Sequence, residues 1–226
     1  MEPSCFLFDA DDTLFDFRSA AKPALLDALR KRGHACGDEM YDTFQSINRP
    51  LWNRRERGEI TLRGIRDIRF RLFFEEVGID DDPITFDELF VHHLSLYGRN
   101  LLPNAEETVK YLSGKYRLAI ITNGISHVQH ERFDSSVIAP YFDRIFVSDD
   151  MGVNKPDKAF FDRVFDELGI RDPSRVMIVG DSLTSDIRGG KNCGAHTCLY
   201  DPFGTTHGDI VPDMTIHDLI ELTEIF

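Results

Sequence analysis

Acidic residues gather near the start of the chain, directly after an apolar run. In the segment FLFDADDTLFDF, residues 6–17, Asp9, Asp11 and Asp12 follow the apolar residues 6–8. Neighbouring carboxylates repel and raise one another's pKa, so this crowding brings no benefit to folding. Paired carboxylates are, however, the residue type that cation binding and acid–base chemistry require. A cluster of helix N-cap residues would also explain the pattern, and both interpretations stay open here.

Three later segments, each following a predicted strand, carry polar or charged residues: a hydroxyl and an amide, a lysine, and two further carboxylates. In IITNG, residues 120–124, the Thr122 hydroxyl and the Asn123 backbone N–H can contact a phosphoryl oxygen at the start of the next helix. Lys155 lies in GVNKPD, residues 152–157, just before another helix. Asp181 and Asp186 lie in VGDSLTSD, residues 179–186. Each segment alone has an ordinary structural explanation, but their order after successive strands indicates one site.

Strands and helices alternate on either side of a long helical stretch. Apolar runs predict strands at residues 5–8, 117–121, 144–147, 175–179 and 196–200. Helical segments separate the later strands, at residues 104–114, 125–137, 156–168, 183–193 and 217–225. This order predicts an α/β fold with a parallel sheet covered on both faces. The four polar segments should then converge at the carboxyl ends of the strands.

The stretch between the first two predicted strands contains only helical periodicity. Helices are expected at residues 18–33, 38–57, 61–77 and 86–97. The sequence therefore predicts a core formed by residues 1–15 and 102–226, and an inserted all-helical cap domain at residues 16–101. Because the insert leaves the carboxyl end of the first strand, it is expected to act as a lid.

Composition excludes several other classes of protein. The 226 residues carry a formal net charge of −13, which offers no electrostatic footprint for nucleic acid or an anionic membrane. The start of the chain lacks the pattern of a signal peptide, and no apolar run approaches the roughly 20 residues of a membrane span. The four cysteines show no C-x-x-C spacing and are expected to be reduced thiols in a cytoplasmic protein. A monomer and a homodimer both stay open.

Taken together, the motifs resemble those of the haloacid dehalogenase (HAD) superfamily. Its members carry D-x-D-x-T, a strand-terminal Ser or Thr, a Lys, and a G-D-x-x-x-x-D motif. Here the four motifs appear in that order, as Asp9, Asp11 and Thr13; Thr122; Lys155; and Gly180, Asp181 and Asp186. The resemblance implies a Rossmann-like, HAD-like α/β core with a helical cap. The segments FDADDTLFDF, INRPLWNRRERGEI, PYFDRIFVSDDMGVNKPDKAFFDRVF and VGDSLTSDIRGGKNCGAHTCLYDP are similar to a subgroup of pyrimidine 5′-nucleotidases that clears noncanonical nucleoside monophosphates.

The resemblance also implies roles for the acidic residues. Mg²⁺ would be held by the carboxylates of Asp9 and Asp181 and by the backbone carbonyl of Asp11. Mn²⁺ and Co²⁺ stay open as substitutes, because sites made of oxygen ligands accept several of these ions. Asp9 would be the nucleophile and form an aspartyl-phosphate. Asp11 would protonate the leaving alkoxide and then remove a proton from water.

The remaining motif residues would bind phosphate or support those that do. Thr122, Asn123 and Lys155 would hold the transferring phosphoryl oxygens. Asp186 would orient Lys155, and Thr13 would fix the turn around the nucleophile.

The cap is expected to recognise the leaving group. Trp52 could stack on a base and Asn48 could hydrogen-bond to its edge. The arginines of the cap are further candidates for facing the cleft, namely Arg54, Arg55, Arg66 and Arg69. Packing of Trp52 between cap helices, with the arginines on a solvated face, is the alternative interpretation.

The motifs and the resemblance together predict an Mg²⁺-dependent phosphomonoester hydrolase whose substrate is a small phosphate ester. The similarity to the nucleotidase subgroup favours a nucleoside 5′-monophosphate, with a pyrimidine base expected. A phosphatase for sugar phosphates or phosphoglycolate, and a phosphomutase on the same core, stay open. By resemblance, haloacid dehalogenases lack a second aspartate equivalent to Asp11, since they have no leaving alkoxide to protonate, so its presence argues against that chemistry. A binding module that lost the chemistry would be expected to have lost Asp9, Asp11 or Lys155.

Overall fold

The chain divides into two compact units. The computed structural model describes residues 3–226. The core unit holds the residues through Asp16 together with Leu101–Phe226, and the helical unit is Phe17–Asn100. These junctions differ by one residue from the boundaries predicted from the sequence. None of the helices in the described part of the chain is long and apolar enough to cross a membrane.

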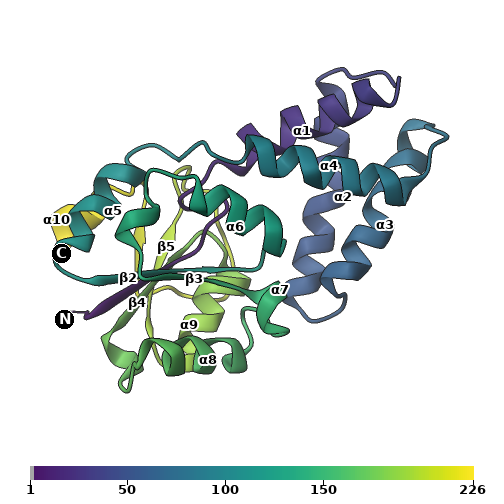
Figure 1. The fold of residues 1–226 in the computed structure, drawn as a ribbon. Coiled ribbons are helices and arrows are strands. Elements are labelled where there is room, and N and C mark those ends of the chain that lie inside the picture. Colours follow the sequence, from purple (N-terminus) through teal and green to yellow (C-terminus); the bar gives the residue numbers. More distant parts are fainter. Residues whose placement is uncertain (1–2) are drawn as a thin grey trace. The chain divides into compact units, whose positions relative to one another are not determined.

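The core unit is built on a six-stranded sheet in which every pairing is parallel, as the sequence predicts (Figure 1). The strand order is β3-β2-β1-β4-β5-β6. The strands are β1 (Cys5–Phe8), β2 (Arg117–Thr122), β3 (Arg144–Val147), β4 (Val176–Gly180), β5 (His196–Tyr200) and β6 (Met214–Ile216). The sequence did not predict β6, because this edge strand has only three residues and exposes its middle one, Thr215.

Helices cover both faces of the sheet, and alternate residues of β1 supply the two sides of the core. Phe6 and Phe8 pack with apolar residues of α5, α6 and α10, whereas Cys5 and Leu7 pack with those of α8 and α9. Figure 1 shows these two groups of helices on opposite sides of the strands. Their bounds are α5 (Ala105–Ser113), α6 (Ser126–Asp134), α8 (Lys158–Leu168), α9 (Arg188–Cys193) and α10 (Glu221–Ile225). Burial on both faces explains why these strands are continuously apolar.

The segment after β4 differs from the single helix expected at residues 183–193. It begins with a π-helical turn, Leu183–Ile187, and continues as α9. The Ser182 hydroxyl caps this turn by accepting a hydrogen bond from the Ser185 N–H at 3.1 Å. The wider turn faces Asp186 inward, where it is 1% exposed. Such π-helical turns often occur at functional sites.

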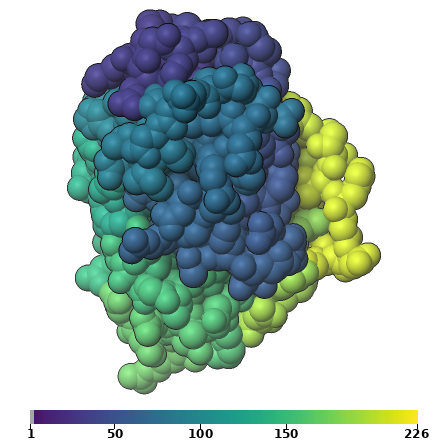
Figure 2. Space-filling view, turned by 90° about the vertical axis from the view of Figure 1, so that its right-hand side faces the viewer, coloured from purple at the N-terminus to yellow at the C-terminus, as the bar shows by residue number. Residues whose placement is uncertain are grey.

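The helical unit consists of four helices, α1 (Phe17–Lys31), α2 (Glu39–Glu56), α3 (Leu62–Val77) and α4 (Pro83–Tyr97). Helix α4 packs against α1 and α3, and α2 packs against α3. Their interior is filled by a cluster of aromatic rings, Phe44, Phe70, Phe73, Phe74, Phe86 and Phe90. Side chains fill the spaces between the helices, as the purple-to-blue surface in Figure 2 shows.

Candidate active site

The nucleophile candidate Asp9 lies at the carboxyl end of the central strand. Phe8, the last residue of β1, is paired with Ile120 of β2 and with Val179 of β4. The Asp9 N–H continues this pairing by donating to the Val179 carbonyl at 2.8 Å. Asp181 follows β4 directly, so the parallel register brings the ends of three neighbouring strands together at Asp9.

Lys155 links the separate motifs. Its side chain is 1% exposed, and its ammonium group donates to Asp9 Oδ1 at 2.5 Å, Asp186 Oδ1 at 2.7 Å and the Ile121 carbonyl at 2.9 Å. Because an ammonium group has three protons, these three acceptors use all of them. The lysine therefore holds the nucleophile candidate and Asp186 in fixed positions.

Asp186 reaches Lys155 because position 180 is a glycine. A Cβ atom at Gly180 would lie 2.3 Å from the Asp186 carboxyl carbon, which real contacts never show. The second oxygen, Asp186 Oδ2, accepts the Ser182 N–H at 3.1 Å. Both carboxylate oxygens of Asp186 are thus engaged within the protein and the residue is 1% exposed, a combination that suits a supporting role.

Thr122 and Asn123 lie at the end of β2, where the sequence predicts phosphate contacts. Thr122 is 1% exposed, and its Oγ1 accepts the Gly124 N–H at 3.1 Å. The Asn123 side chain pairs with the Lys155 backbone: its amide donates to the carbonyl at 2.9 Å, and its Oδ1 accepts the N–H at 3.0 Å. The Asn123 side chain therefore fixes the loop that carries Lys155, a role that the sequence did not indicate.

The turn after Asp9 is held by backbone hydrogen bonds. The N–H groups of Leu14 and Phe15 both donate to the Ala10 carbonyl, and the Asp12 N–H donates to the Phe15 carbonyl. Asp12 has φ 58°, a left-handed conformation that favours glycine, and asparagine and aspartate tolerate it best among other residues. The Thr13 hydroxyl is buried and has no hydrogen-bond partner among residues 3–226, so the backbone closes this turn.

Burial and crowding change the ionisation of the acidic cluster. Burial raises the pKa of Asp9 to about 7; the positive charge of Lys155 opposes this shift and the negative charge of Asp186 adds to it. Burial, together with the charges of Asp9 and Asp186, also raises the pKa of Asp181 well above its usual range. For Lys155, burial acts to lower the pKa, but Asp186 and Asp9 outweigh it and the net shift is upward. The single positive charge of Lys155 therefore does not balance the carboxylates of Asp9, Asp181 and Asp186.

The acidic cluster fits a divalent cation. Oxygens of Asp9, Asp181 and Asp186 lie within 4.8 Å of one another. Mg²⁺ binds oxygen ligands at about 2.0–2.1 Å in octahedral geometry, so ligand oxygens around it lie up to about 4.2 Å apart. Because Lys155 and the Ser182 N–H use both oxygens of Asp186, the carboxylates of Asp9 and Asp181 are the better candidates for ligands.

Asp11 is bound by two residues that the sequence analysis missed. Gln129 and Arg132 of α6 each donate a hydrogen bond to its carboxylate, at 2.7 and 2.6 Å. Their spacing of three residues on the helix that follows Thr122 is the one signal that could have indicated them.

The candidate substrate residues Asn48 and Trp52 both lie on α2. Asn48 is 2% exposed, and its Oδ1 has no hydrogen-bond partner among residues 3–226. The Arg55 guanidinium lies 5.4 Å from the centre of the Trp52 ring, a cation–π distance. Arg66 and Arg69, also candidates from the sequence, instead bind Asp87 within the helical unit, at 2.8 and 2.6 Å.

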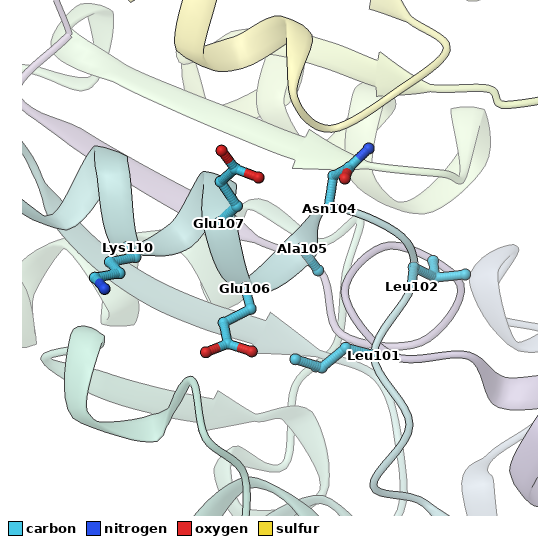
Figure 3. A pocket seen from close by; sticks show the side chains of 7 residues that line it. All are labelled: Leu101, Leu102, Asn104, Ala105, Glu106, Glu107 and Lys110. Atoms are coloured by element: carbon cyan, nitrogen blue, oxygen red, sulfur yellow. The ribbon is translucent and has the colours of Figure 1, made fainter.

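A surface pocket lies at the start of α5 in the core unit (Figure 3). It is lined by Leu101, Leu102, Asn104, Ala105, Glu106, Glu107 and Lys110. The Glu106 and Glu107 side chains point in opposite directions, so the charged groups do not converge on a common point (Figure 3). The pocket contains none of the residues that the sequence predicts for the site.

The chain is similar to several known proteins along most of its length. The HAD-hydrolase YfnB of Bacillus subtilis is 34% identical over 97% of this chain and 93% of its own length. The structure of YfnB bound to magnesium matches with a TM-score of 0.94 and 33% identity, over 100% of this chain and 99% of that chain. Pyrimidine 5′-nucleotidase YjjG of Escherichia coli is 32% identical, covering 96% of this chain and 95% of its own.

A further relative has a different substrate class. A glyceraldehyde 3-phosphate phosphatase of Methanothermobacter thermautotrophicus is 29% identical over 85% of this chain and 83% of its own. The family model for haloacid dehalogenase-like hydrolases matches residues 3–194, which include Asp9, Thr122, Lys155 and Asp181. The chain therefore belongs to the haloacid dehalogenase-like hydrolases.

Proposed function

We propose that the protein is an Mg²⁺-dependent phosphomonoesterase that acts on nucleoside 5′-monophosphates. The observation that carries this proposal is the arrangement around Asp9, which is held by Lys155 and lies beside Asp181, while Asp11 is held apart by other residues. Because Asp9 and Asp11 are held by different residues, their carboxylates can take different roles in the reaction. The similarity to pyrimidine 5′-nucleotidase YjjG supports the choice of substrate.

In the proposed reaction, the Asp9 carboxylate attacks phosphorus and the bond to the leaving oxygen breaks. Asp11 gives its proton to that oxygen, and the phosphoryl group is then carried on Asp9. A water molecule next attacks phosphorus and transfers a proton to Asp11. This step releases phosphate and restores Asp9. Proton transfers of this kind are typically worth about 10²–10⁴ in rate.

Three further groups would stabilise the phosphoryl oxygens, where negative charge is greatest, and Lys155 would do so through its charge because its three protons already have acceptors. The Thr122 hydroxyl can donate while it accepts the Gly124 N–H, the Asn123 backbone N–H lies beside it, and Lys155 supplies the positive charge. Mg²⁺, when bound by Asp9, Asp181 and the Asp11 carbonyl, would neutralise phosphate charge and favour the ionised form of Asp9. In the helical unit, Asn48 and Trp52 remain candidates for contacting the base.

The test is phosphate release from UMP, dUMP, dTMP, CMP, AMP, GMP, glyceraldehyde 3-phosphate, glucose 6-phosphate and phosphoglycolate, with Mg²⁺ and with EDTA. Wild type and Asp9→Asn are compared, because the asparagine keeps the size of the side chain but is a poor nucleophile. We expect release from pyrimidine monophosphates that both the substitution and EDTA abolish. Unchanged release by Asp9→Asn would contradict the chemistry.

Sugar phosphate hydrolysis is the second candidate, favoured by the similarity to the glyceraldehyde 3-phosphate phosphatase. Release from the sugar phosphates alone would keep the mechanism and contradict the nucleotidase proposal. No release from any substrate by folded protein would contradict hydrolysis itself and favour phosphoryl transfer within a sugar phosphate.

A further inference from the structure

Asp11 is held by two side chains of α6. Gln129 Nε2 donates to Asp11 Oδ2 at 2.7 Å, and one Arg132 guanidinium nitrogen donates to Asp11 Oδ1 at 2.6 Å. Gln129 and Arg132 lie three residues apart, which places them on the same face of the helix. Each therefore binds a different oxygen of the same carboxylate.

The three side chains form a closed ring of hydrogen bonds. The other terminal nitrogen of Arg132 donates to Gln129 Oε1, so the amide of Gln129 accepts from the arginine and donates to Asp11. This arrangement fixes the orientation of the amide. A carboxylate that accepts a hydrogen bond at only one oxygen could still rotate about that hydrogen bond. Two donors, one at each oxygen, fix both the position and the plane of the carboxylate.

The surroundings keep this ring in place. Arg132 is 2% exposed, and its guanidinium lies 4.3 Å from the centre of the Phe15 ring. A Cβ atom at Gly124 would lie 1.9 Å from Gln129 Nε2, so glycine at this position leaves room for the amide. A buried guanidinium is costly unless it is paired, and the charged partner that it contacts is Asp11.

We propose that Gln129 and Arg132 are positioning residues for Asp11, fixing its carboxylate for proton transfer to the leaving oxygen and then from the attacking water. This inference rests on the proposed role of Asp11 as general acid and base. If Asp11 is free to rotate, the acid spends less time within hydrogen-bond reach of the leaving oxygen, and the reaction slows. The effect should depend on how strongly the leaving group needs a proton.

The experiment compares kcat/KM for UMP with kcat/KM for p-nitrophenyl phosphate, whose weakly basic leaving group departs without protonation. If the protein hydrolyses only sugar phosphates, glyceraldehyde 3-phosphate replaces UMP. The variants are Gln129→Met, which keeps the volume of the side chain, and Arg132→Lys, which keeps its charge. Because general acid catalysis is typically worth about 10²–10⁴, we expect kcat/KM for UMP to fall about 10-fold or more. For p-nitrophenyl phosphate, kcat/KM should fall less than about 3-fold, because it reports the steps up to departure of the leaving group.

His130→Gln provides the matched control. His130 lies on the same helix but binds Asp150 at 2.8 Å. Its replacement should therefore leave kcat/KM for both substrates unchanged. Thermal unfolding checks that each variant folds, and Gln129→Met provides the test if Arg132→Lys does not. In the Asp11→Asn background, Gln129→Met should cause no further loss, since the group that it positions is already inactive.

Two outcomes would overturn the proposal in different ways. If Asp11→Asn lowers UMP turnover selectively but Gln129→Met lowers both substrates equally, the positioning role is wrong and the proposed function stands. If Asp11→Asn itself fails to discriminate between the substrates, the acid–base role of Asp11 is wrong and the inference fails with it.

Discussion

Replacing Lys155 with methionine should destabilise the core unit as well as stop the reaction. The ammonium group binds Asp9, Asp186 and the Ile121 carbonyl at 2.5, 2.7 and 2.9 Å. Lys155 and Asp186 are each 1% exposed and Asp9 is 7% exposed, so solvent screens these charges weakly. Methionine fills a similar volume but leaves two buried carboxylates without their positive partner.

The expected loss follows from that burial. Removing one partner of a buried ion pair costs about 3–5 kcal/mol. For a chain of this size, each kcal/mol lowers Tm by about 2–4 °C, so the expected fall is about 6–20 °C. The measurement is thermal unfolding at pH 8 in EDTA, because a bound cation would replace part of the missing charge.

The loss should also depend on pH. Asp9 already has a pKa of about 7, raised by burial, and the charge of Lys155 acts to lower it. Without the lysine this pKa rises further, so the folded variant binds a proton that the unfolded chain releases at much lower pH. The stability of the variant therefore falls as pH rises from the pKa of Asp9 in the unfolded chain toward its higher pKa in the folded protein, and it returns as pH falls. We expect the difference from wild type to be largest at pH 8 and smaller at pH 5.

Two comparisons make the test specific. Lys158→Met removes an exposed lysine that pairs with Asp162 on α8 and should change Tm little. Adding Asp186→Asn to Lys155→Met should recover part of the lost stability, because one unpaired carboxylate is gone. A fall in Tm no larger than that of Lys158→Met, or one independent of pH, would show that Lys155 does not compensate these charges.

Three further predictions concern the acidic cluster and the helical unit. Asp181→Asn should raise Tm in EDTA, since the neutral side chain removes charge repulsion from a buried site. The same substitution should abolish the rise in Tm that Mg²⁺ causes. An unchanged rise in Tm with Mg²⁺ would exclude Asp181 as a ligand. In wild type without metal, the raised pKa of Asp9 should make Tm fall between pH 5 and pH 8, and Mg²⁺ should reduce this slope, as thermal scans in paired buffers would detect. Asp87→Asn leaves the buried Arg69 without its carboxylate partner and should lower the stability of the helical unit by about 3–5 kcal/mol. Amide hydrogen exchange in α3 and α4 measures this loss. Amide protection equal to that of wild type would contradict the importance of this pair.

The sequence alone determined most of the fold. Apolar runs alternating with helical segments indicated the parallel sheet, because a strand buried on both faces must be apolar throughout. The position of Asp9 after the first such run placed it at the carboxyl edge, and the same reasoning placed Thr122 and Asp181. These are local signals, since each strand carries its own hydrophobicity and its own polar end. Strand β6 and the π-helical turn before α9 escaped detection because their sequences carry weak local patterns.

Tertiary structure decided which atoms meet. Lys155 and Asp9 are 146 residues apart, and Gln129 and Asp11 are 118 residues apart. No local periodicity records such pairs, because they form only when the strands assemble in the order β3-β2-β1-β4-β5-β6. The sequence thus located the groups that can react with phosphate, whereas packing of distant segments decided how Asp11 is held and gave Asp9 its raised pKa.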